Sequence, residues 1–171
     1  MIHIYHGDGK GKTTCGMGLC LRAAGAGKKV LIFQFMKDGR SSERAALGQV
    51  KGITLMEGPE KVRFTGAMSP RERDAFAAYC REQLQVIKKR VATEAFDLVF
   101  LDEVLYAVSK QLIPETQLID MLRALPPSVE WVLTGRDPGG DLREMADYIS
   151  EIRKEKHPYD KGIKARIGIE Y

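Results

Sequence analysis

The sequence lacks several features that would assign a chain of 171 residues to a secreted, membrane or zinc-binding class. Its three cysteines, Cys15, Cys20 and Cys80, cannot all pair and show no CxxC or metal-ligand spacing. No apolar run approaches the ~20 residues that a membrane span needs. The N-terminal residues lack the charged-then-apolar layout of a signal peptide. We therefore expect a cytoplasmic protein with reduced thiols and no contact with a membrane.

The charged residues form no long block of one sign. The formal net charge is +4 at pH 7, and basic and acidic residues are mixed along the chain. No basic run is long enough to indicate a nucleic-acid-binding arm, so we expect no nucleic-acid partner. The excess of positive charge is more simply explained by an anionic small ligand or by chance. The chain also shows no Ser–His–Asp or Cys–His constellation that would activate a protein nucleophile.

What the chain does contain is a regular alternation of strand-like and helix-like segments. Short apolar or β-branched runs predict strands at residues 2–5, 30–35, 52–58, 97–103, 129–136 and 148–156. Helix-like patterns fall between them, at residues 12–26, 43–50, 70 to beyond 91, from 104, 114–125 and within 138–147. The alternation predicts an α/β fold of the P-loop NTPase-like kind, with a mostly parallel sheet covered by helices on both faces. We expect residues 1–171 to form a single domain.

The stretch HGDGKGKTT, residues 6–14, lies between the first strand and the first helix and looks like a phosphate-binding loop. Its three glycines leave the backbone free to direct N–H groups toward an anion, and the following helix adds its positive dipole end. Lys12 can reach phosphate oxygens, and the Thr13 hydroxyl can hold Mg²⁺. The usual pattern has a glycine where His6 stands, so the loop begins one residue late. The predicted ATP-binding residues are Gly7, Asp8, Gly9, Lys10, Gly11, Lys12, Thr13 and Thr14.

Polar side chains also follow three other predicted strands. Asp102 and Glu103 end the run LVFLDE, where a carboxylate can bind Mg²⁺ directly or through water. Glu103 could instead orient a water or a substrate group. Arg136 follows the next strand and is well placed for a phosphate, and Gln34 and Lys37 follow the second strand. Because the carboxyl ends of parallel strands share one edge, the sequence predicts a magnesium–nucleotide site there.

Five stretches, in order along the chain, carry a resemblance to a known family: GDGKGKTT, RAAGAGKKVLIFQFMKDG, DLVFLDEVLYAV, VLTGRDP and EKHPYDKGIKARIGIEY. Together they resemble the successive motifs of the P-loop ATP:corrinoid adenosyltransferases, also called cob(I)alamin or cob(I)yrinic acid a,c-diamide adenosyltransferases. The match runs in register from residue 2 to the C-terminus. The late glycine and the ending KHPYDKGI…GIEY are both marks of this family.

The resemblance implies that the chain transfers the 5′-deoxyadenosyl group of ATP to the Co(I) of a corrinoid and releases tripolyphosphate. The product serves adenosylcobalamin biosynthesis or salvage. The resemblance further implies Mg²⁺ with ATP, an electron donor that reduces Co(II) to Co(I), and a homodimer. Lys12, Thr13, Asp102, Glu103 and Arg136 would be the catalytic residues, and the metal would lie on Thr13, Asp102 and Glu103.

The family is understood to crowd out the lower cobalt ligand with apolar or aromatic side chains. The matching stretch here is VRFTGAM, in which Phe64 matches the first family aromatic. The second aromatic falls at Gly66, which leaves Met68 or another segment to complete the corrinoid-binding wedge. The C-terminal segment, residues 157–171, is a candidate cover for the site.

Two alternatives use the same phosphate loop. A small P-loop kinase or NTPase would transfer the γ-phosphoryl group and release ADP, whereas an adenosyltransferase releases tripolyphosphate. A non-catalytic nucleotide- or corrinoid-binding module would bind ATP without turnover. The intact Lys–Thr–Thr and Asp–Glu sets argue against such a module.

Overall fold

The computed structural model describes residues 1–59, 61–63 and 65–170. Its centre is a six-stranded sheet with the order β3-β2-β4-β5-β1-β6. Every pairing between neighbouring strands is parallel, as the alternating pattern predicts. The strands are β1 (Ile2–His6), β2 (Val30–Gln34), β3 (Ile53–Leu55), β4 (Leu98–Asp102), β5 (Glu130–Gly135) and β6 (Tyr148–Glu151).

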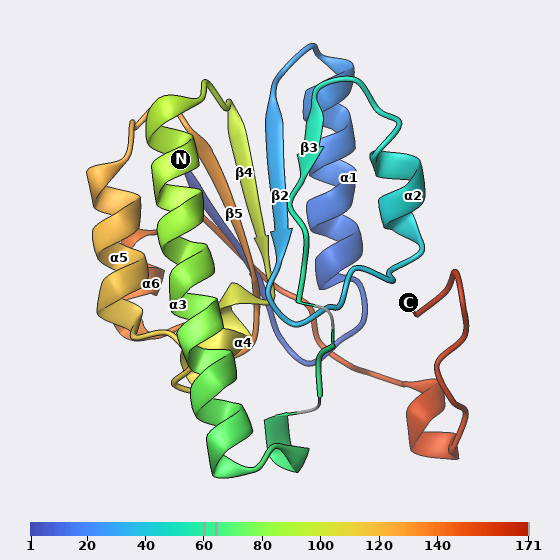
Figure 1. The fold of residues 1–171 in the computed structure, drawn as a ribbon. Coiled ribbons are helices and arrows are strands. Elements are labelled where there is room, and N and C mark those ends of the chain that lie inside the picture. The colour runs from blue at the N-terminus through green and yellow to red at the C-terminus, as the bar shows by residue number, and fades with distance from the viewer. Residues whose placement is uncertain (60, 64, 171) are drawn as a thin grey trace.

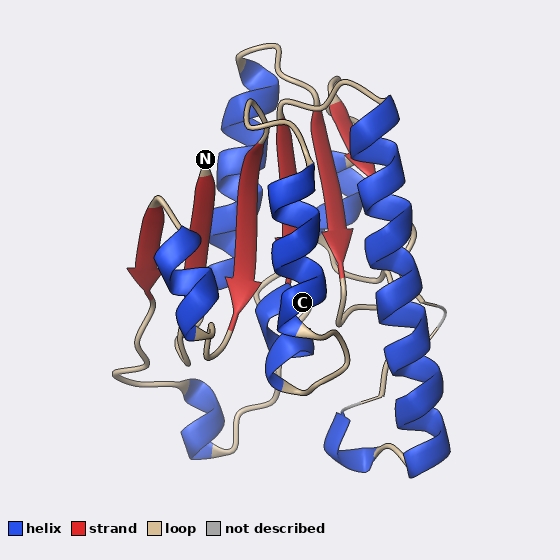
Figure 2. Cartoon of the chain, turned by 90° about the vertical axis from the view of Figure 1, so that its left-hand side faces the viewer, coloured by secondary structure: helices blue, strands red, loops and turns tan. Residues whose placement is uncertain are grey.

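Helices cover both faces of the sheet, as Figures 1 and 2 show. The α-helices are α1 (Lys12–Gly25), α2 (Glu43–Leu47), α3 (Pro70–Thr93), α4 (Val104–Ser109), α5 (Glu115–Ala124) and α6 (Gly140–Met145). Buried side chains of α1 and α2 pack in one core cluster, and those of α3 to α6 pack in the other. Two 3-10 turns, Thr65–Ala67 and Pro158–Lys161, lie in the connecting segments. The α/β prediction is therefore confirmed.

The long helix α3 begins where its capping signals predict. The Ser69 side chain accepts a hydrogen bond from the Glu72 backbone N–H, and the Glu72 carboxylate accepts one from the Ser69 N–H. Pro70 occupies the first helical position, where its missing N–H costs nothing. The buried face has the predicted spacing of three and four residues: Phe76, Ala77, Cys80, Leu84, Ile87 and Val91.

The neighbouring interior strands β2 and β4 are buried on both faces, which explains their largely apolar sequences. Alternate side chains point to opposite sides of the sheet. Leu31 and Phe33 face the α3 side, whereas Val30 and Ile32 face the α1 side. This rigid centre holds the ends of β2 and β4 in fixed positions.

The last strand is shorter than the sequence suggests. Strand β6 ends at Glu151 rather than continuing to residue 156. The next residues leave the sheet and run along the phosphate loop: Ile152 accepts a hydrogen bond from the Gly9 N–H, at 2.8 Å. The Lys154 N–H donates to the Asp8 carboxylate, at 2.9 Å. The predicted strand is therefore confirmed for residues 148–151 and wrong for residues 152–156, where the Ile152 carbonyl and the Lys154 N–H bond to the loop instead. No helix in the described part of the chain is long and apolar enough to cross a membrane.

Candidate active site

The phosphate loop joins β1 to α1 at the carboxyl edge of the sheet. Gly7 and Gly11 have φ angles of 119° and 125°, which side-chain-bearing residues rarely adopt. The Gly7 N–H donates to the Gly135 carbonyl at 3.2 Å, and the Gly9 N–H donates to the Ile152 carbonyl at 2.8 Å. The N–H groups of Gly7 and Gly9 are therefore bonded to neighbouring segments and are not free to bind an anion. The amides at the start of α1 remain to face an anion.

Lys12 and Thr13 begin α1 with their side chains turned toward the loop and the sheet. The Lys12 ammonium is buried and donates to the Gly9 carbonyl at 2.9 Å. Burial lowers the pKa of Lys12, because the charged form loses water. The Thr13 hydroxyl donates to one carboxylate oxygen of Asp102 at 2.9 Å. The structure thus brings together the loop threonine and the strand-end carboxylate, as predicted.

Asp102 is fully buried at the end of β4 and lies at the centre of a polar network. The oxygen that accepts from Thr13, Oδ1, also accepts from the Thr134 hydroxyl at 2.8 Å. The other oxygen, Oδ2, accepts from the Gln34 amide at 3.2 Å and lies 3.3 Å from the Lys37 ammonium. The ends of three neighbouring strands therefore converge on one carboxylate.

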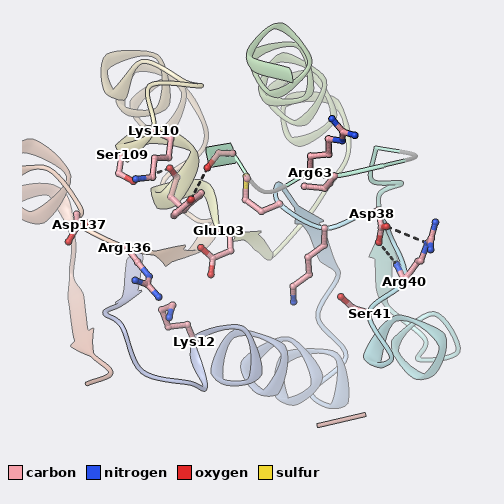
Figure 3. A pocket seen from close by; sticks show the side chains of 15 residues that line it. Lys12, Asp38, Arg40, Ser41, Arg63, Glu103, Ser109, Lys110, Arg136 and Asp137 are labelled. Atoms are coloured by element: carbon pink, nitrogen blue, oxygen red, sulfur yellow. Dashed lines mark hydrogen bonds and ion pairs between the residues drawn. The ribbon is translucent and has the colours of Figure 1, made fainter. Parts of the chain in front are cut away.

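Glu103 follows directly and adopts a left-handed conformation, with φ 59° and ψ 21°. Its backbone N–H donates to the Thr134 hydroxyl at 2.9 Å, so that hydroxyl bridges Glu103 and Asp102. Burial raises the pKa of the Glu103 carboxyl, and the negative charge of Asp102 raises it further, while Lys12 opposes both effects. In Figure 3 the side chains of Lys12, Glu103 and Arg136 converge on one end of a cavity.

Two cavities meet at this point. We call the first the side cavity: its volume is about 730 Å³, and its walls include Met36, Val62, Arg63, Tyr106, Lys110 and Arg136. We call the second the loop cavity: its volume is about 780 Å³, and its walls include residues 9–14, Met17, Glu43 and residues 168–170. Lys12, Lys37 and Glu103 line both cavities. These three residues therefore form the boundary between the loop cavity and the side cavity.

The C-terminal segment forms one wall of the loop cavity, where residues 168–170 face the phosphate loop. Figure 1 shows this segment, in red, leaving the sheet and turning back beside α1 and α2. Near its start the Lys154 ammonium pairs with the Asp160 carboxylate at 3.0 Å. His157 has a local structural contact there, since its ring nitrogen accepts from the Tyr159 N–H at 3.1 Å.

The segment that matches the family's wedge lies beside the side cavity. Phe64 falls outside the described residues. Val62, Arg63 and Thr65 line the side cavity, and the Thr65 hydroxyl is 2.9 Å from the Tyr106 hydroxyl. Met68 lies farther along the segment and packs against the core on the α3 side. The contact between Tyr106 and this segment could not be predicted from the sequence, because it joins residues 41 positions apart.

The oxygen donors at the carboxyl edge suit Mg²⁺. The Thr13 hydroxyl and the Asp102 carboxylate are hard oxygen ligands in direct contact, and Glu103 and Glu43 also line the loop cavity. The described residues hold no group of three or more His, Cys, Asp or Glu side chains arranged around a metal. Mg²⁺ needs no such cage, because it usually keeps several waters and binds one or two carboxylates with substrate phosphates. The residues present therefore fit Mg²⁺ bound to ATP.

His6, which replaces the usual first glycine, is buried at the end of β1. Its ring nitrogen lies 3.5 Å from the Arg143 guanidinium. Burial lowers the pKa of His6, and the positive charge of Arg143 lowers it further. The contact with Arg143 joins the end of β1 to α6.

Comparisons with known proteins agree with one another. A family described as "ATP:corrinoid adenosyltransferase BtuR/CobO/CobP" matches residues 1–171. A corrinoid adenosyltransferase of Escherichia coli is 36% identical over 172 residues, with 100% of this chain and 85% of that protein covered. The corresponding protein of Salmonella typhimurium is 35% identical with the same coverage. A corrinoid adenosyltransferase of Sinorhizobium is 32% identical over 178 residues and is covered over 80% of its length.

Among solved structures, a KaiC-like protein of Pyrococcus horikoshii has the same kind of fold. The TM-score is 0.51 at 16% sequence identity, and the match covers 91% of this chain and 74% of the other. At that identity the likeness concerns the fold alone, and it agrees with a P-loop NTPase-like architecture.

Proposed function

This chain belongs to the ATP:corrinoid adenosyltransferase family, and we propose how its site carries out the transfer of the 5′-deoxyadenosyl group from ATP to Co(I). The observation that carries the proposal is the meeting of the loop cavity and the side cavity at Lys12, Lys37 and Glu103. ATP would occupy the loop cavity and the corrinoid the side cavity. The reacting atoms, C5′ of ATP and the cobalt, would then meet at the boundary.

The substrate supplies the nucleophile in this reaction. The electron pair of Co(I) forms the Co–C5′ bond, the C5′–O bond breaks, and its electron pair leaves on tripolyphosphate. No side chain has to act as a covalent nucleophile. The protein's contribution is therefore to position the two substrates and to stabilise the charge that develops on the leaving group.

Charge stabilisation falls to a small set of cationic groups around the loop. Lys12 lies at the start of α1, where the helix dipole also favours an anion. Lys10 lines the loop cavity, and Arg136 reaches the boundary from the end of β5. Removing one such donor typically costs on the order of 10²–10³ in rate. We propose residues 7–14 as the ATP-binding segment, with Lys12 and Arg136 as catalytic residues.

Mg²⁺ bound to ATP would be held by Thr13 and Asp102, with Glu103 beside them. The ion supplies positive charge that offsets the charge of the phosphates. Asp102 is suited to this role because three strand ends hold it in place and its side chain is fully buried. Glu103 lines both cavities and can also accept a hydrogen bond at the substrate boundary.

The partly apolar walls of the side cavity support a corrinoid there. We propose Phe64 and Met68 as residues of the corrinoid-binding segment, next to Val62 and Thr65, which line the cavity. The enzyme would need an electron donor to reduce Co(II), and we expect it to act as a homodimer in the cytoplasm. Buried free thiols such as Cys20 and Cys80 agree with a reducing compartment.

One experiment tests the reaction directly. The protein is incubated with Mg-ATP, a corrinoid and a strong reductant, and the phosphate product and the corrinoid spectrum are determined. We expect tripolyphosphate and a light-sensitive cobalt–carbon product in equal amounts. Lys12→Met should lower the rate of formation of both by on the order of 10²–10³, whereas Lys28→Met, which lies beyond the C-terminal end of α1, should change neither. Release of ADP would show γ-phosphoryl transfer instead.

A further inference from the structure

Lys37 makes a set of contacts that the reaction scheme above leaves unused. It follows β2, and its side chain is 27% exposed. Its ammonium lies 3.3 Å from the Asp102 carboxylate, 3.5 Å from the Glu43 carboxylate and 3.5 Å from the Thr13 hydroxyl. A single positive charge thus touches three oxygen-bearing groups around the proposed magnesium site.

Lys37 is also the charge that compensates Asp102. The other groups that bond to this buried carboxylate are neutral: the hydroxyls of Thr13 and Thr134 and the amide of Gln34. Among the described residues, Lys37 is the cation within ion-pair distance of Asp102. A buried carboxylate without a cationic partner is strongly unfavourable, and Lys37 provides that partner in this structure.

The same oxygens cannot serve two cations equally well. Mg²⁺ on Thr13 and Asp102 would lie close to the present position of the Lys37 ammonium, and like charges at such separations repel strongly where water is partly excluded. We propose that Lys37 is an exchangeable counter-cation: it pairs with Asp102 in the metal-free protein and gives way when Mg-ATP binds. This inference rests on the proposed magnesium site at Thr13 and Asp102.

After this exchange the Lys37 side chain can move within the two cavities that it lines. Its side chain lines both the loop cavity and the side cavity, so a change of side-chain rotamer keeps it at the boundary. There it would meet the triphosphate, which carries more negative charge than one Mg²⁺ offsets. Lys37 would thus pass from a carboxylate in the free protein to the leaving group in the complex. Metal alone would bind weakly, because without phosphates the released lysine keeps only the partly exposed Glu43 carboxylate as an anionic partner.

The test measures Mn²⁺ binding by electron paramagnetic resonance, with and without ATP. In the absence of nucleotide, Lys37→Met should bind Mn²⁺ about tenfold or more tightly than the parent protein, because the competing charge is gone. Lys37→Arg keeps the charge and should stay weak. Arg40→Met is the matched control: it removes a cation from the same cavity wall, but Arg40 pairs with Asp38 and not with Asp102.

The melting temperature provides a second measurement. In EDTA, Lys37→Met should melt below the parent protein, and Mg²⁺ alone should restore most of the difference. Arg40→Met should melt like the parent in both conditions. Circular dichroism spectra identify any variant that fails to fold. If Lys37→Met does not fold, Lys37→Arg can still be compared with Arg40→Met and the parent protein.

The outcomes distinguish the proposed cation exchange at Lys37 from the proposed magnesium site at Thr13 and Asp102. If Lys37→Met binds free Mn²⁺ no more tightly than the parent while Mn-ATP still binds through Asp102, the exchange is wrong and the metal site stands. If Asp102→Asn leaves Mn-ATP binding unchanged, the metal site itself is wrong and the exchange falls with it. Equal tightening in Lys37→Met and Arg40→Met would also overturn the exchange, because it would reflect net charge alone.

Discussion

Replacing Thr134 by valine should lower both stability and activity, although the two side chains differ by only one hydroxyl group. Valine has nearly the same shape as threonine but no hydroxyl. The Thr134 hydroxyl is fully buried, donates to Asp102 at 2.8 Å and accepts from the Glu103 N–H at 2.9 Å. The substitution therefore removes two hydrogen bonds at once, with no route for water to replace them.

The magnitude follows from the two groups left behind. A hydrogen bond to a charged group contributes about 1.5–3 kcal/mol, and a buried N–H left without a partner costs about 1–3 kcal/mol. Thr134→Val should therefore lower the free energy of unfolding by roughly 3 kcal/mol or more. Thr134→Ser keeps the hydroxyl and loses one methyl group, which should cost about 1 kcal/mol.

The functional loss should follow the same order. Glu103 has a left-handed backbone that its bond to Thr134 helps to hold, and Asp102 shares the same hydroxyl. Urea unfolding gives the stability change, and tripolyphosphate release gives kcat/KM. We expect Thr134→Val to lose about tenfold or more in kcat/KM, equivalent to about 1.4 kcal/mol, and Thr134→Ser to lose little. If valine and serine variants were equally stable and equally active, the bridging role of the hydroxyl would be refuted.

Three further predictions concern the loop and the boundary. Gly9→Ala should abolish ATP binding, because a Cβ there would lie 2.8 Å from the Arg153 carbonyl group, whereas Gly18→Ala meets nothing within 4 Å and should bind ATP normally by calorimetry. Lys12→Met should lower kcat by on the order of 10²–10³ with stability retained; a smaller loss than tenfold would exclude a role in leaving-group stabilisation. The pKa of Glu103 is raised in the folded state above its ordinary value of 4.5. Between pH 4.5 and the raised pKa, the folded protein therefore binds more protons than the unfolded chain. The contribution of Glu103 to the free energy of unfolding should fall as the pH rises through this range. Glu103→Gln should remove that part of the fall in melting temperature, and parallel curves for both proteins would contradict it.

Much of this fold could be predicted from local patterns along the chain. The capping box at Ser69 and Glu72 identifies the start of α3, and the apolar runs of β2 and β4 identify buried strands without any structure. Strand order is not local, but the carboxyl edge follows once the strands are known to be parallel. This is why Thr13 and Asp102 could be paired from the sequence.

The contacts that could not be predicted depend on side chains from distant segments meeting at one point. Lys37 and Asp102 are separated by 65 positions, and nothing in MKDG or LDE indicates that one neutralises the other. The path after β6 was also missed, because RKEK has no pattern that distinguishes a strand from a segment bonded to a loop. These residues leave the sheet because the phosphate loop provides other hydrogen-bond partners, the Gly9 N–H and the Asp8 carboxylate.

The late glycine of the phosphate loop has a structural consequence that bears on the chemistry. Gly7 and Gly9 approach the backbone of residues 152–153 so closely that a side chain at either position would clash. Their N–H groups are bonded to the carbonyls of Gly135, at the end of β5, and of Ile152, just after β6, so the first half of the loop is held by these two segments. Fewer backbone amides are then available for phosphates than in a loop whose amides all turn inward. Under the proposed function, side chains would then supply more of the positive charge, and lysines from two segments, Lys12 and Lys37, line the boundary between the two cavities.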